Sequence, residues 1–535
     1  MHFFIGFVAG GVALVISFLL RFFANGLFIP ELAAQTLFSL MPGAIESQAV
    51  ETLGPLAKQL AFAGAIIANL FLYGALGVFL HKTYKRLAYK GYLVNLLQLS
   101  LISYFILFAI AAIMLEVTQF LSQPLPISLI ALYLLPPHIA FGFILSYTFQ
   151  RQVARQELLQ QMGSTQESHI NIGRRRFLHI AVAGAIGSAI FFSVVGLLSP
   201  KSSKPSDKVA LQPTKSPSSL EDVFADQRLA SFVASEVTPN HRFYRVDVNI
   251  LTPTINANTW KLTVKGLLNN PLEFTYEELR SLPAVEEYAT LECISNKIGE
   301  DLISTALWKG IPLKDILEKA QVRPEATYVV FKCYDGYDVG IPLERALKTI
   351  LAYEMNGATL PQDHGFPLRA VVPGLYGMMN AKWITEIELV DKTYEGFWQR
   401  HGWSNNAEYQ IHSTIVTLGA ALKYRFGDLG SSKFVLGEKV PIAGIAFAGD
   451  RGISKVEVSM DYGKSWETTG IKDALSNNTW VLWATEWNPP AAGIYSIIVR
   501  ATDKTGRVQT QEFQNPFPSG SKGYHKVDIT VEAPS

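Results

Sequence analysis

Cys293 is the residue whose chemistry most needs an explanation, because it is one of only two cysteines in 535 residues. It lies in the stretch LECISN, and the second cysteine is Cys333. Three fates are open to its thiol: a disulfide with Cys333, burial as a small hydrophobic group, or ligation of a metal as a thiolate. A structural zinc site is excluded, since it needs four ligands and Cys293 has neither a CxxC partner nor a histidine close by in the sequence. A metal whose other ligands belong to a cofactor remains open.

The composition divides the chain into a membrane-bound part and a soluble part. The formal net charge is only +1, and the basic residues gather at the edges of apolar runs rather than along one face, so a nucleic-acid partner is excluded. Each apolar run is long enough to cross a bilayer, which takes about 20 residues in a helix. The five runs are Phe3–Leu20, Leu60–Leu80, Leu93–Leu115, Ile127–Phe149 and Phe177–Leu198.

The charges between these runs predict the orientation of the chain in the membrane. Residues 81–92 carry four Lys or Arg residues and no acid, whereas the loop between the first two runs carries Glu31, Glu46 and Glu51. Because short cytoplasmic loops collect basic residues, residues 81–92 are expected inside the cell and the acidic loop outside. The fifth run then carries everything after Ser199 out of the cytoplasm. We expect a multi-pass protein of the cell membrane with an extracytoplasmic soluble part.

The motif GRRRFLHI at residues 173–180 directly precedes the fifth run. Arg174 and Arg175 before Phe177 and Leu178 and an apolar run are typical of a twin-arginine export signal, although a simple basic anchor is the alternative. We favour the export signal. No small-residue cleavage site precedes the following tether, which favours an uncleaved anchor. Such a signal predicts that the soluble part folds and acquires a cofactor in the cytoplasm before export.

The soluble part divides into two folds after a tether rich in Ser, Pro and Lys. Strand-like TWKLTVKG alternates with helical YEELRSL and PLKDILEKA, which predicts an α+β domain. Short alternating strands separated by turn residues follow from about Glu408 and predict a β-sandwich. The predicted segments are a four-helix transmembrane region at 1–150, the signal and fifth helix at 151–199, the tether at 200–219, the α+β domain at 220–407 and the β-sandwich at 408–535.

From Thr238 to Trp403 the sequence resembles the molybdopterin-dependent sulfite oxidase family. The motifs that carry the resemblance occur in the family's order: TPNHRFYRVDV, LECISN, STALWKGIPLKDIL, DGYDVGIPLERAL, LAYEMNGATLP, DHGFPLRAVVPGLYGMMNAKW and GFWQRHGW. The C-terminal part resembles the family's immunoglobulin-like dimerisation domain. The resemblance implies transmembrane α-helices, then an α+β molybdopterin domain and an immunoglobulin-like β-sandwich, and it implies a homodimer.

The resemblance also assigns the site residues. Cys293 falls at the position of the thiolate that binds molybdenum, so it is expected to be free, with Cys333 in the core. The residues expected to bind the molybdenum-molybdopterin cofactor are Arg245, Cys293, His364, Arg369, Asn380, Ala381 and Lys382. Tyr337 and Arg245 match family residues that face the substrate, and with Cys293 they form the expected catalytic set. The alternatives are that Arg369 is a surface charge beside a buried strand and that Tyr337 and Arg245 are structural strand residues.

Three departures from the family pattern concern the substrate pocket. An arginine expected shortly after the cysteine is replaced where Lys297 and Ile298 stand, Met379 stands in place of another arginine, and Asp247 replaces a histidine. A pocket that loses positive charge and gains an acid binds a dianion less well. Fold and cofactor are thus better supported than sulfite as the substrate.

Electrons need a route to and from such a metal. The sequence has no CxxCH haem-attachment motif, and two cysteines cannot hold an iron–sulfur cluster, so we expect a separate cytochrome or quinone-linked partner. His138 and His81 are candidate ligands of a haem b, but their different membrane depths favour a plain anchor. The expected function is sulfite oxidase-like oxo transfer on a small molecule. The alternatives are reduction of an S- or N-oxide such as methionine sulfoxide, and a cofactor-free binding module at the cell surface.

Overall fold

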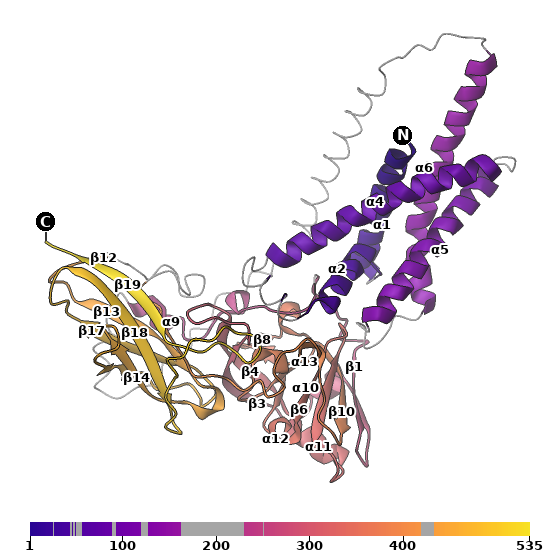
Figure 1. Cartoon of the computed structure of the whole chain (residues 1–535). Helices are drawn as coiled ribbons and strands as arrows, with labels where there is room; N and C mark the ends of the chain where they lie inside the picture. The colour runs from indigo at the N-terminus through magenta and orange to yellow at the C-terminus, as the bar shows by residue number, and fades with distance from the viewer. Residues whose placement is uncertain are drawn as a thin grey trace. The chain divides into compact units, whose positions relative to one another are not determined.

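The computed structural model describes two compact units, one helical and N-terminal and the other built mostly from strands (Figure 1). The described residues are 1–24, 26–42, 45, 49, 56–87, 92–118, 127–161, 229–249, 251–418 and 433–534. The predicted fifth span, the twin-arginine motif and the tether lie outside these residues.

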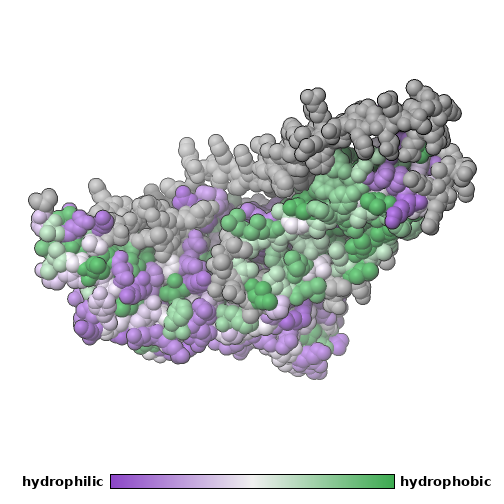
Figure 2. Space-filling view, turned by 45° about the horizontal axis from the view of Figure 1, so that its top comes forward, coloured by the Kyte–Doolittle hydropathy of each residue, from purple (hydrophilic) through white to green (hydrophobic). Residues whose placement is uncertain are grey.

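Four long apolar helices make up most of the helical unit: α1 (His2–Ala24), α4 (Leu56–Leu87), α5 (Tyr92–Thr118) and α6 (Ile127–Gln161). Each contains a stretch long and apolar enough to span a membrane: His2–Ala24, Leu56–Tyr84, Val94–Leu115 and Ser128–Ala154. The first four predicted runs therefore correspond to these helices. Hydrophobic residues cover much of the visible surface of these helices in Figure 2, and Val12, Phe71 and Phe105 are among those exposed. Such a surface suits a lipid environment.

The sequence analysis missed the short helix α2 (Ile29–Leu40), which lies in the segment predicted to be an acidic loop. Glu31 of this helix is buried and forms a bidentate ion pair with Arg21 at the end of α1, with Nε to Oε2 at 2.7 Å and a second guanidinium nitrogen to Oε1 at 3.1 Å. A buried carboxylate needs such a partner. Glu31 is therefore not an exposed loop charge, as the predicted membrane orientation assumed. Only Glu46 and Glu51 remain as acidic residues that favour an outside location for this segment.

Close contact between α1 and α4 depends on glycines. A β-carbon at Gly77 of α4 would lie 2.6 Å from the Cα of Gly6 and 2.8 Å from the carbonyl oxygen of His2. Gly64 on the same helix has no neighbouring atom within 4 Å of the equivalent position. The two helix backbones therefore pack directly against each other at Gly6 and Gly77, as small residues allow in membranes.

Gly77→Ala is expected to destabilise the helical unit, because the new methyl group would clash with backbone atoms. Backbone atoms cannot turn away as the end of a flexible side chain can. The expected cost is roughly 1–3 kcal/mol. Heating the full chain in detergent while following helical circular dichroism measures the effect, and Gly64→Ala is the matched control. Equal melting temperatures for the two variants would contradict the direct backbone contact.

The α+β domain contains two sheets and several short helices, as predicted. One sheet has the order β2-β1-β10-β5-β6 and consists of β1 (Lys261–Gly266), β2 (Leu272–Thr275), β5 (Tyr328–Cys333), β6 (Asp338–Pro342) and β10 (Ile384–Val390). The other joins β3 (Val285–Glu292), β4 (Ile303–Pro312), β7 (Ile350–Met355) and β8 (Ala358–Thr359), with β9 (Arg369–Val371) paired to β7. The helical turns are α9 (Ala230–Ala234), η2 (Asn240–Arg242), α10 (Tyr276–Arg280), α11 (Leu313–Ala320), α12 (Leu343–Ala346), η3 (Gln362–His364), η4 (Gly377–Met379) and α13 (Phe397–Arg400).

Local sequence explains the two predicted helices. Helix α11 buries Leu313, Ile316, Leu317 and Ala320, the spacing of one helical face. Helix α10 begins with a capping box, in which Thr275 accepts from the amide of Glu278 and Glu278 accepts from the amide of Thr275. Both helices pack next to the second sheet and so support the hairpin that carries Cys293.

The C-terminal part is formed by two facing sheets. One has the order β11-β13-β17-β16 and the other β12-β19-β18-β14-β15. Their strands are β11 (His412–Ile415), β12 (Lys433–Val435), β13 (Val440–Phe447), β14 (Ile453–Ser459), β15 (Glu467–Thr468), β16 (Gly470–Ile471), β17 (Val481–Trp487), β18 (Gly493–Asp503) and β19 (His525–Glu532), and η5 is Gly449–Arg451. Side chains from both sheets form one core that includes Ile442, Val456, Trp483, Ile497 and Ile529. The predicted two-layer β architecture is therefore present, and its immunoglobulin-like character stays a prediction.

Candidate active site

Cys293 begins the loop that joins β3 to β4, with its thiol buried at the end of the strand. The Cys293 amide donates to the carbonyl of Leu302 at 2.9 Å, so the two chain ends of the loop are paired. Its Sγ lies 3.0 Å from the Ser295 hydroxyl, and only 7% of the residue is exposed. Cys333 ends β5 in the other sheet and is fully buried. Neither cysteine forms a disulfide, as predicted.

Arg369 is a buried cation with no carboxylate in contact among the described residues. It begins β9, is 5% exposed, and donates to the carbonyls of His364 at 3.0 Å and Asn380 at 3.5 Å. The guanidinium lies 4.9 Å from the ring centre of Trp308, and its Nε has no hydrogen-bond partner in the described part of the chain. Burial lowers the pKa of Arg369 to about 10. A buried charge without a counter-ion is costly, so this position suits an anionic ligand. The alternative of a surface charge is wrong.

Two tyrosines, the half-buried Tyr244 and the buried Tyr409, connect the surroundings of Cys293 and Arg369. Tyr244 lies within electrostatic reach of both residues, and so does Tyr409, whose hydroxyl accepts from the amide of Glu292 at 3.4 Å. Burial is the main reason that the pKa of each phenol is raised, and the charge of the Cys293 thiolate raises it further. Both phenols therefore stay protonated and keep a hydroxyl donor near the thiol and the guanidinium.

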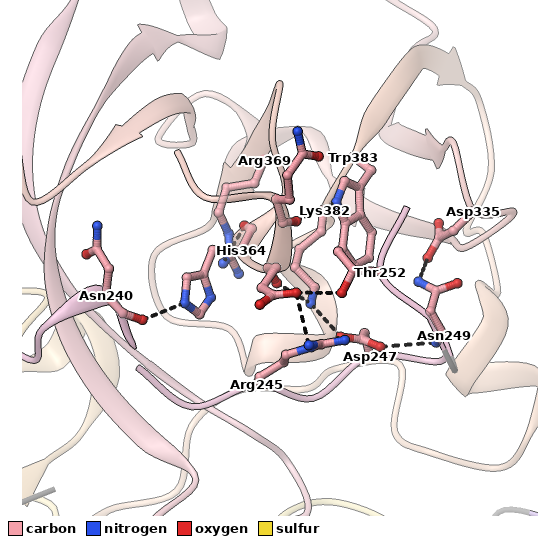
Figure 3. A network of polar contacts seen from close by, with 12 residues as sticks. Asn240, Arg245, Asp247, Asn249, Thr252, Asp335, His364, Arg369, Lys382 and Trp383 are labelled. Carbon is pink, nitrogen blue, oxygen red and sulfur yellow. Dashed lines mark hydrogen bonds and ion pairs between the residues drawn. The ribbon is translucent and has the colours of Figure 1, made fainter. Parts of the chain in front are cut away.

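His364 is a neutral residue whose imidazole is held by a backbone carbonyl. Its Nε2 lies 2.8 Å from the carbonyl oxygen of Asn240, so Nε2 carries the proton and Nδ1 is left as an acceptor. Burial lowers its pKa to about 4, and the neighbouring charges of Arg369 and Lys382 act in the same direction. Figure 3 shows His364 beside Arg369, which donates to the His364 carbonyl, and contact of either residue with the cofactor stays a prediction.

Arg245 and Lys382 share a single acid, Asp247, as Figure 3 shows. Asp247 accepts from Nε of Arg245 at 3.0 Å and from Nζ of Lys382 at 3.1 Å, and its side chain is only 4% exposed. Arg245 also pairs with Asp363 at 2.9 Å. Burial lowers the pKa of Lys382 to about 8 despite the opposing charge of Asp247. Burial likewise lowers the pKa of Arg245, but Asp247 and Asp363 outweigh it and leave that pKa raised.

The remaining predicted residues occupy structural positions next to this network. The Asn380 side chain accepts from the amide of Val372 at 2.7 Å and donates to two carbonyls, so it organises the loop after β9. Ala381 accepts from the amide of Ala370 at 2.8 Å. Gly377 abuts this loop, and a β-carbon there would lie 2.3 Å from the hydroxyl of Tyr244. A cofactor contact of Asn380 or Ala381 stays a prediction.

Tyr337 lies between β5 and β6 with its ring buried. Its hydroxyl donates to the carbonyl of Met378 at 2.6 Å, and burial raises its pKa well above the ordinary value. The next residue, Met379, contacts the amide nitrogen of Gln399 through its sulfur at 3.2 Å. At the position where the family has an arginine, this chain thus has the uncharged thioether of Met379 in contact with the uncharged amide of Gln399.

Sequence analysis missed Asp335, a buried acid next to Tyr337. Asn249 donates to Oδ2 at 2.6 Å and the amide of Tyr337 donates to Oδ1 at 3.1 Å. Burial nevertheless raises the pKa of Asp335 from 3.8 to about 6. The spacing Asp-x-Tyr in YDGYD was the only available signal, because the burial depends on the tertiary fold.

Asp335 predicts a pH dependence of stability. Between pH 4 and 6 the folded chain keeps a proton that the unfolded chain releases, so the free energy of unfolding should fall as pH rises through this window, by about 3 kcal/mol in total. Asp335→Asn cannot titrate and should lack this decline. Denaturant titrations of both proteins at several pH values measure it. Parallel pH profiles for the two would contradict the assignment.

Comparisons with known proteins agree with this arrangement. The family model described as an oxidoreductase molybdopterin binding domain matches residues 249–398, and one described as a Mo-co oxidoreductase dimerisation domain matches residues 406–532. The sulfite oxidase of Arabidopsis thaliana is 28% identical over 351 residues, covering 54% of this chain and 86% of that protein. The mitochondrial sulfite oxidase of Homo sapiens is 28% identical over 337 residues, which is 55% of this chain and 62% of the human protein.

Two further similarities cover parts of the chain. An uncharacterized oxidoreductase of Bacillus subtilis is 36% identical over 146 residues, covering 27% of this chain and 72% of that protein. The sulfane dehydrogenase SoxCD from Paracoccus pantotrophus, a solved structure, aligns with 63% of this chain and 98% of its own at 21% identity and a TM-score of 0.48.

The soluble part is thus a molybdopterin-binding enzyme domain followed by a dimerisation-type domain. The chain belongs to the sulfite oxidase family of molybdopterin-dependent oxidoreductases, whose cofactor is molybdenum-molybdopterin. The site fits this cofactor, because Cys293 offers a soft thiol that forms no disulfide and Arg369 offers a buried guanidinium whose Nε has no partner in the described part of the chain.

Proposed function

We propose that this chain is a membrane-anchored, extracytoplasmic oxidoreductase that catalyses oxo transfer in the manner of sulfite oxidases, with Cys293 as the protein ligand of molybdenum. The observation that carries the proposal is that the buried thiol of Cys293, which forms no disulfide, and the buried guanidinium of Arg369, which contacts no carboxylate among the described residues, both lie within electrostatic reach of Tyr244. When bound, the molybdenum centre supplies two-electron oxo-transfer chemistry.

The chain's own residues bind the cofactor and control protons. The Arg369 guanidinium holds an anionic group of the cofactor, and His364 adds an acceptor at Nδ1. Lys382, whose pKa is about 8, supplies a proton or a positive charge beside the cofactor. Tyr337 keeps its phenol protonated, so it acts as a hydrogen-bond donor to substrate or product when released from Met378.

A second substrate class is favoured by Asp247. Because Asp247 already pairs with both Arg245 and Lys382, these cations are less available to a dianion such as sulfite. The uncharged pair of Met379 and Gln399 acts in the same direction. Reduction of a neutral S- or N-oxide is therefore the second candidate.

A substrate screen distinguishes the two candidates. The molybdenum-loaded full chain is assayed with artificial electron acceptors for sulfite oxidation and with artificial donors for reduction of sulfoxides and N-oxides. Turnover of sulfite supports the first candidate and turnover of a neutral oxide the second. A loaded protein that turns over neither class would contradict the proposed oxo transfer.

The proposed surroundings of the enzyme follow from sequence and similarity. The four apolar helices support a lipid-bilayer anchor. The basic segment at residues 81–92, together with the predicted fifth run at Phe177–Leu198, supports an extracytoplasmic catalytic domain. The match to a dimerisation domain supports a homodimer. His138 contacts Tyr73, whereas His81 stacks on His2, so the two histidines have different surroundings and do not support one shared haem. A separate cytochrome or quinone-linked partner therefore remains the proposed route for electrons.

A further inference from the structure

Glu292 directly precedes Cys293 and is fully buried at the end of β3. Its Oε1 accepts from the side-chain amide of Asn296 at 2.9 Å. The other side-chain atom of Asn296, Oδ1, accepts from the amide of Leu302 at 2.9 Å. The carbonyl of Leu302 also accepts from the amide of Cys293. One chain of hydrogen bonds therefore connects both ends of the loop that carries the thiol.

Residues of the C-terminal domain also form hydrogen bonds with this loop. His412, the first residue of β11, donates from Nδ1 to the same Oε1 of Glu292, and its Nε2 lies 3.0 Å from the carbonyl oxygen of Ser521. The hydroxyl of Ser521 donates to the carbonyl of Asn296 at 2.7 Å. We call Glu292, Asn296, His412 and Ser521 the clamp.

The chemistry of the clamp is that of a closed hydrogen-bonded ring. A carbonyl oxygen only accepts, so His412 Nε2 carries a proton toward Ser521, and Glu292 and His412 hold one further proton between them. All four residues are buried, with His412 at 6% exposed and Ser521 at 1%. The bonds of the ring converge on Oε1 of Glu292, whereas its buried Oε2 has no hydrogen-bond partner in the described part of the chain. A buried network of this kind restricts the geometry of the residues that it joins.

Other contacts already join the two domains away from the loop. Lys472 pairs with Glu236 at 2.7 Å, and the indole of Trp480 donates to the Glu236 carbonyl at 3.1 Å. The clamp is therefore not needed to keep the domains together, and its contacts fall on the residues that flank Cys293.

We propose that the C-terminal domain positions the Cys293 thiol for molybdenum through the clamp, so that His412 and Ser521 are positioning residues of the metal site. The inference rests on the proposed role of Cys293 as the metal ligand. It gives the domain a task in the active site of its own chain, in addition to any role in dimerisation. Residues that orient a metal ligand typically change metal affinity by about 10–100-fold when replaced.

The test compares His412→Gln with Lys472→Met, which breaks an interdomain ion pair without touching the loop. Full-length proteins are purified in detergent from a molybdenum-replete host, and molybdenum loss on dialysis and the thiolate-to-molybdenum absorption band are recorded. His412→Gln is expected to lose molybdenum about 10–100-fold faster and to shift the band. Lys472→Met should match the wild type in both measurements.

Equal metal retention and identical spectra for His412→Gln and Lys472→Met would overturn the clamp. If His412→Gln shows no cooperative unfolding transition, Ser521→Ala decides, because it removes the bond to the Asn296 carbonyl and the 3.3 Å contact with Nε2 of His412 but keeps the imidazole. Ser521→Ala should still lose metal faster than Lys472→Met. A folded wild type without molybdenum would count against both the ligand assignment and the clamp. A metal-loaded wild type with an unaffected Ser521→Ala and His412→Gln contradicts the clamp alone.

Discussion

Cys293→Ser is expected to leave the protein folded but nearly free of molybdenum. The hydroxyl retains the size of the thiol and its contact with Ser295, so the free energy of unfolding should change by about 1 kcal/mol. A neutral alcohol is a poor ligand for a soft metal centre, so bound molybdenum should fall more than about 100-fold, beyond the effect of residues that only orient a ligand.

Cys333→Ser is the matched control for this experiment. Cys333 is the chain's other cysteine and is fully buried in a different sheet. Burial raises its pKa well above the ordinary value, so it is an inert core thiol. Its replacement should lower stability but not the molybdenum content of the folded fraction. Retention of molybdenum by Cys293→Ser, or its loss from folded Cys333→Ser, would show that the ligand is assigned to the wrong cysteine.

Arg369→Leu is expected to separate cofactor binding from folding. In the metal-free protein the substitution removes a buried charge whose Nε has no partner in the described residues, and it also removes two hydrogen bonds to backbone carbonyls. The free energy of unfolding should therefore be unchanged, or higher by roughly 1–4 kcal/mol reduced by the loss of those two bonds. In the loaded protein it removes the proposed partner of an anionic group, at a cost of roughly 2–5 kcal/mol. Cofactor affinity should therefore fall about 30-fold or more.

Pterin content and thermal unfolding, measured on loaded and metal-free preparations, test both halves of this prediction. Arg323→Leu is the control, because Arg323 is exposed and its side chain bonds only to the side chain of Asn269 among the contacts described. Normal pterin content in Arg369→Leu would exclude a cofactor contact. A large loss of stability in the metal-free protein would instead show that Arg369 is a structural residue.

Local patterns allowed most of the elements to be predicted. The apolar runs predicted α1, α4, α5 and α6, and alternating residues predicted strands such as β13 and β18, because these signals depend only on neighbours in sequence. Helix α2 was missed because its charge, Glu31, suggested a loop and only the ion pair with Arg21 explains its burial. A helix with a compensated charge has no distinct sequence signal.

Candidate site residues could be named one by one from the sequence, but the contacts between them could not. Cys293, His364 and Arg369 were identified from motifs, whereas the shared pairing of Asp247 with two cations depends on how distant segments meet. The same is true of His412, which meets Glu292 across 120 positions of sequence and lies in a domain whose pattern suggested only strands. Such contacts follow from tertiary packing, which a single sequence does not specify.

Cys293 and Arg369 mark the proposed molybdenum-pterin site of the proposed membrane-anchored enzyme. The most direct measurement is the molybdenum content per chain of the purified full-length wild-type protein, produced in a molybdenum-replete host. We predict about one molybdenum atom per chain, held with pterin. A well-folded protein that contains no molybdenum would contradict this account and would favour a cofactor-free binding module.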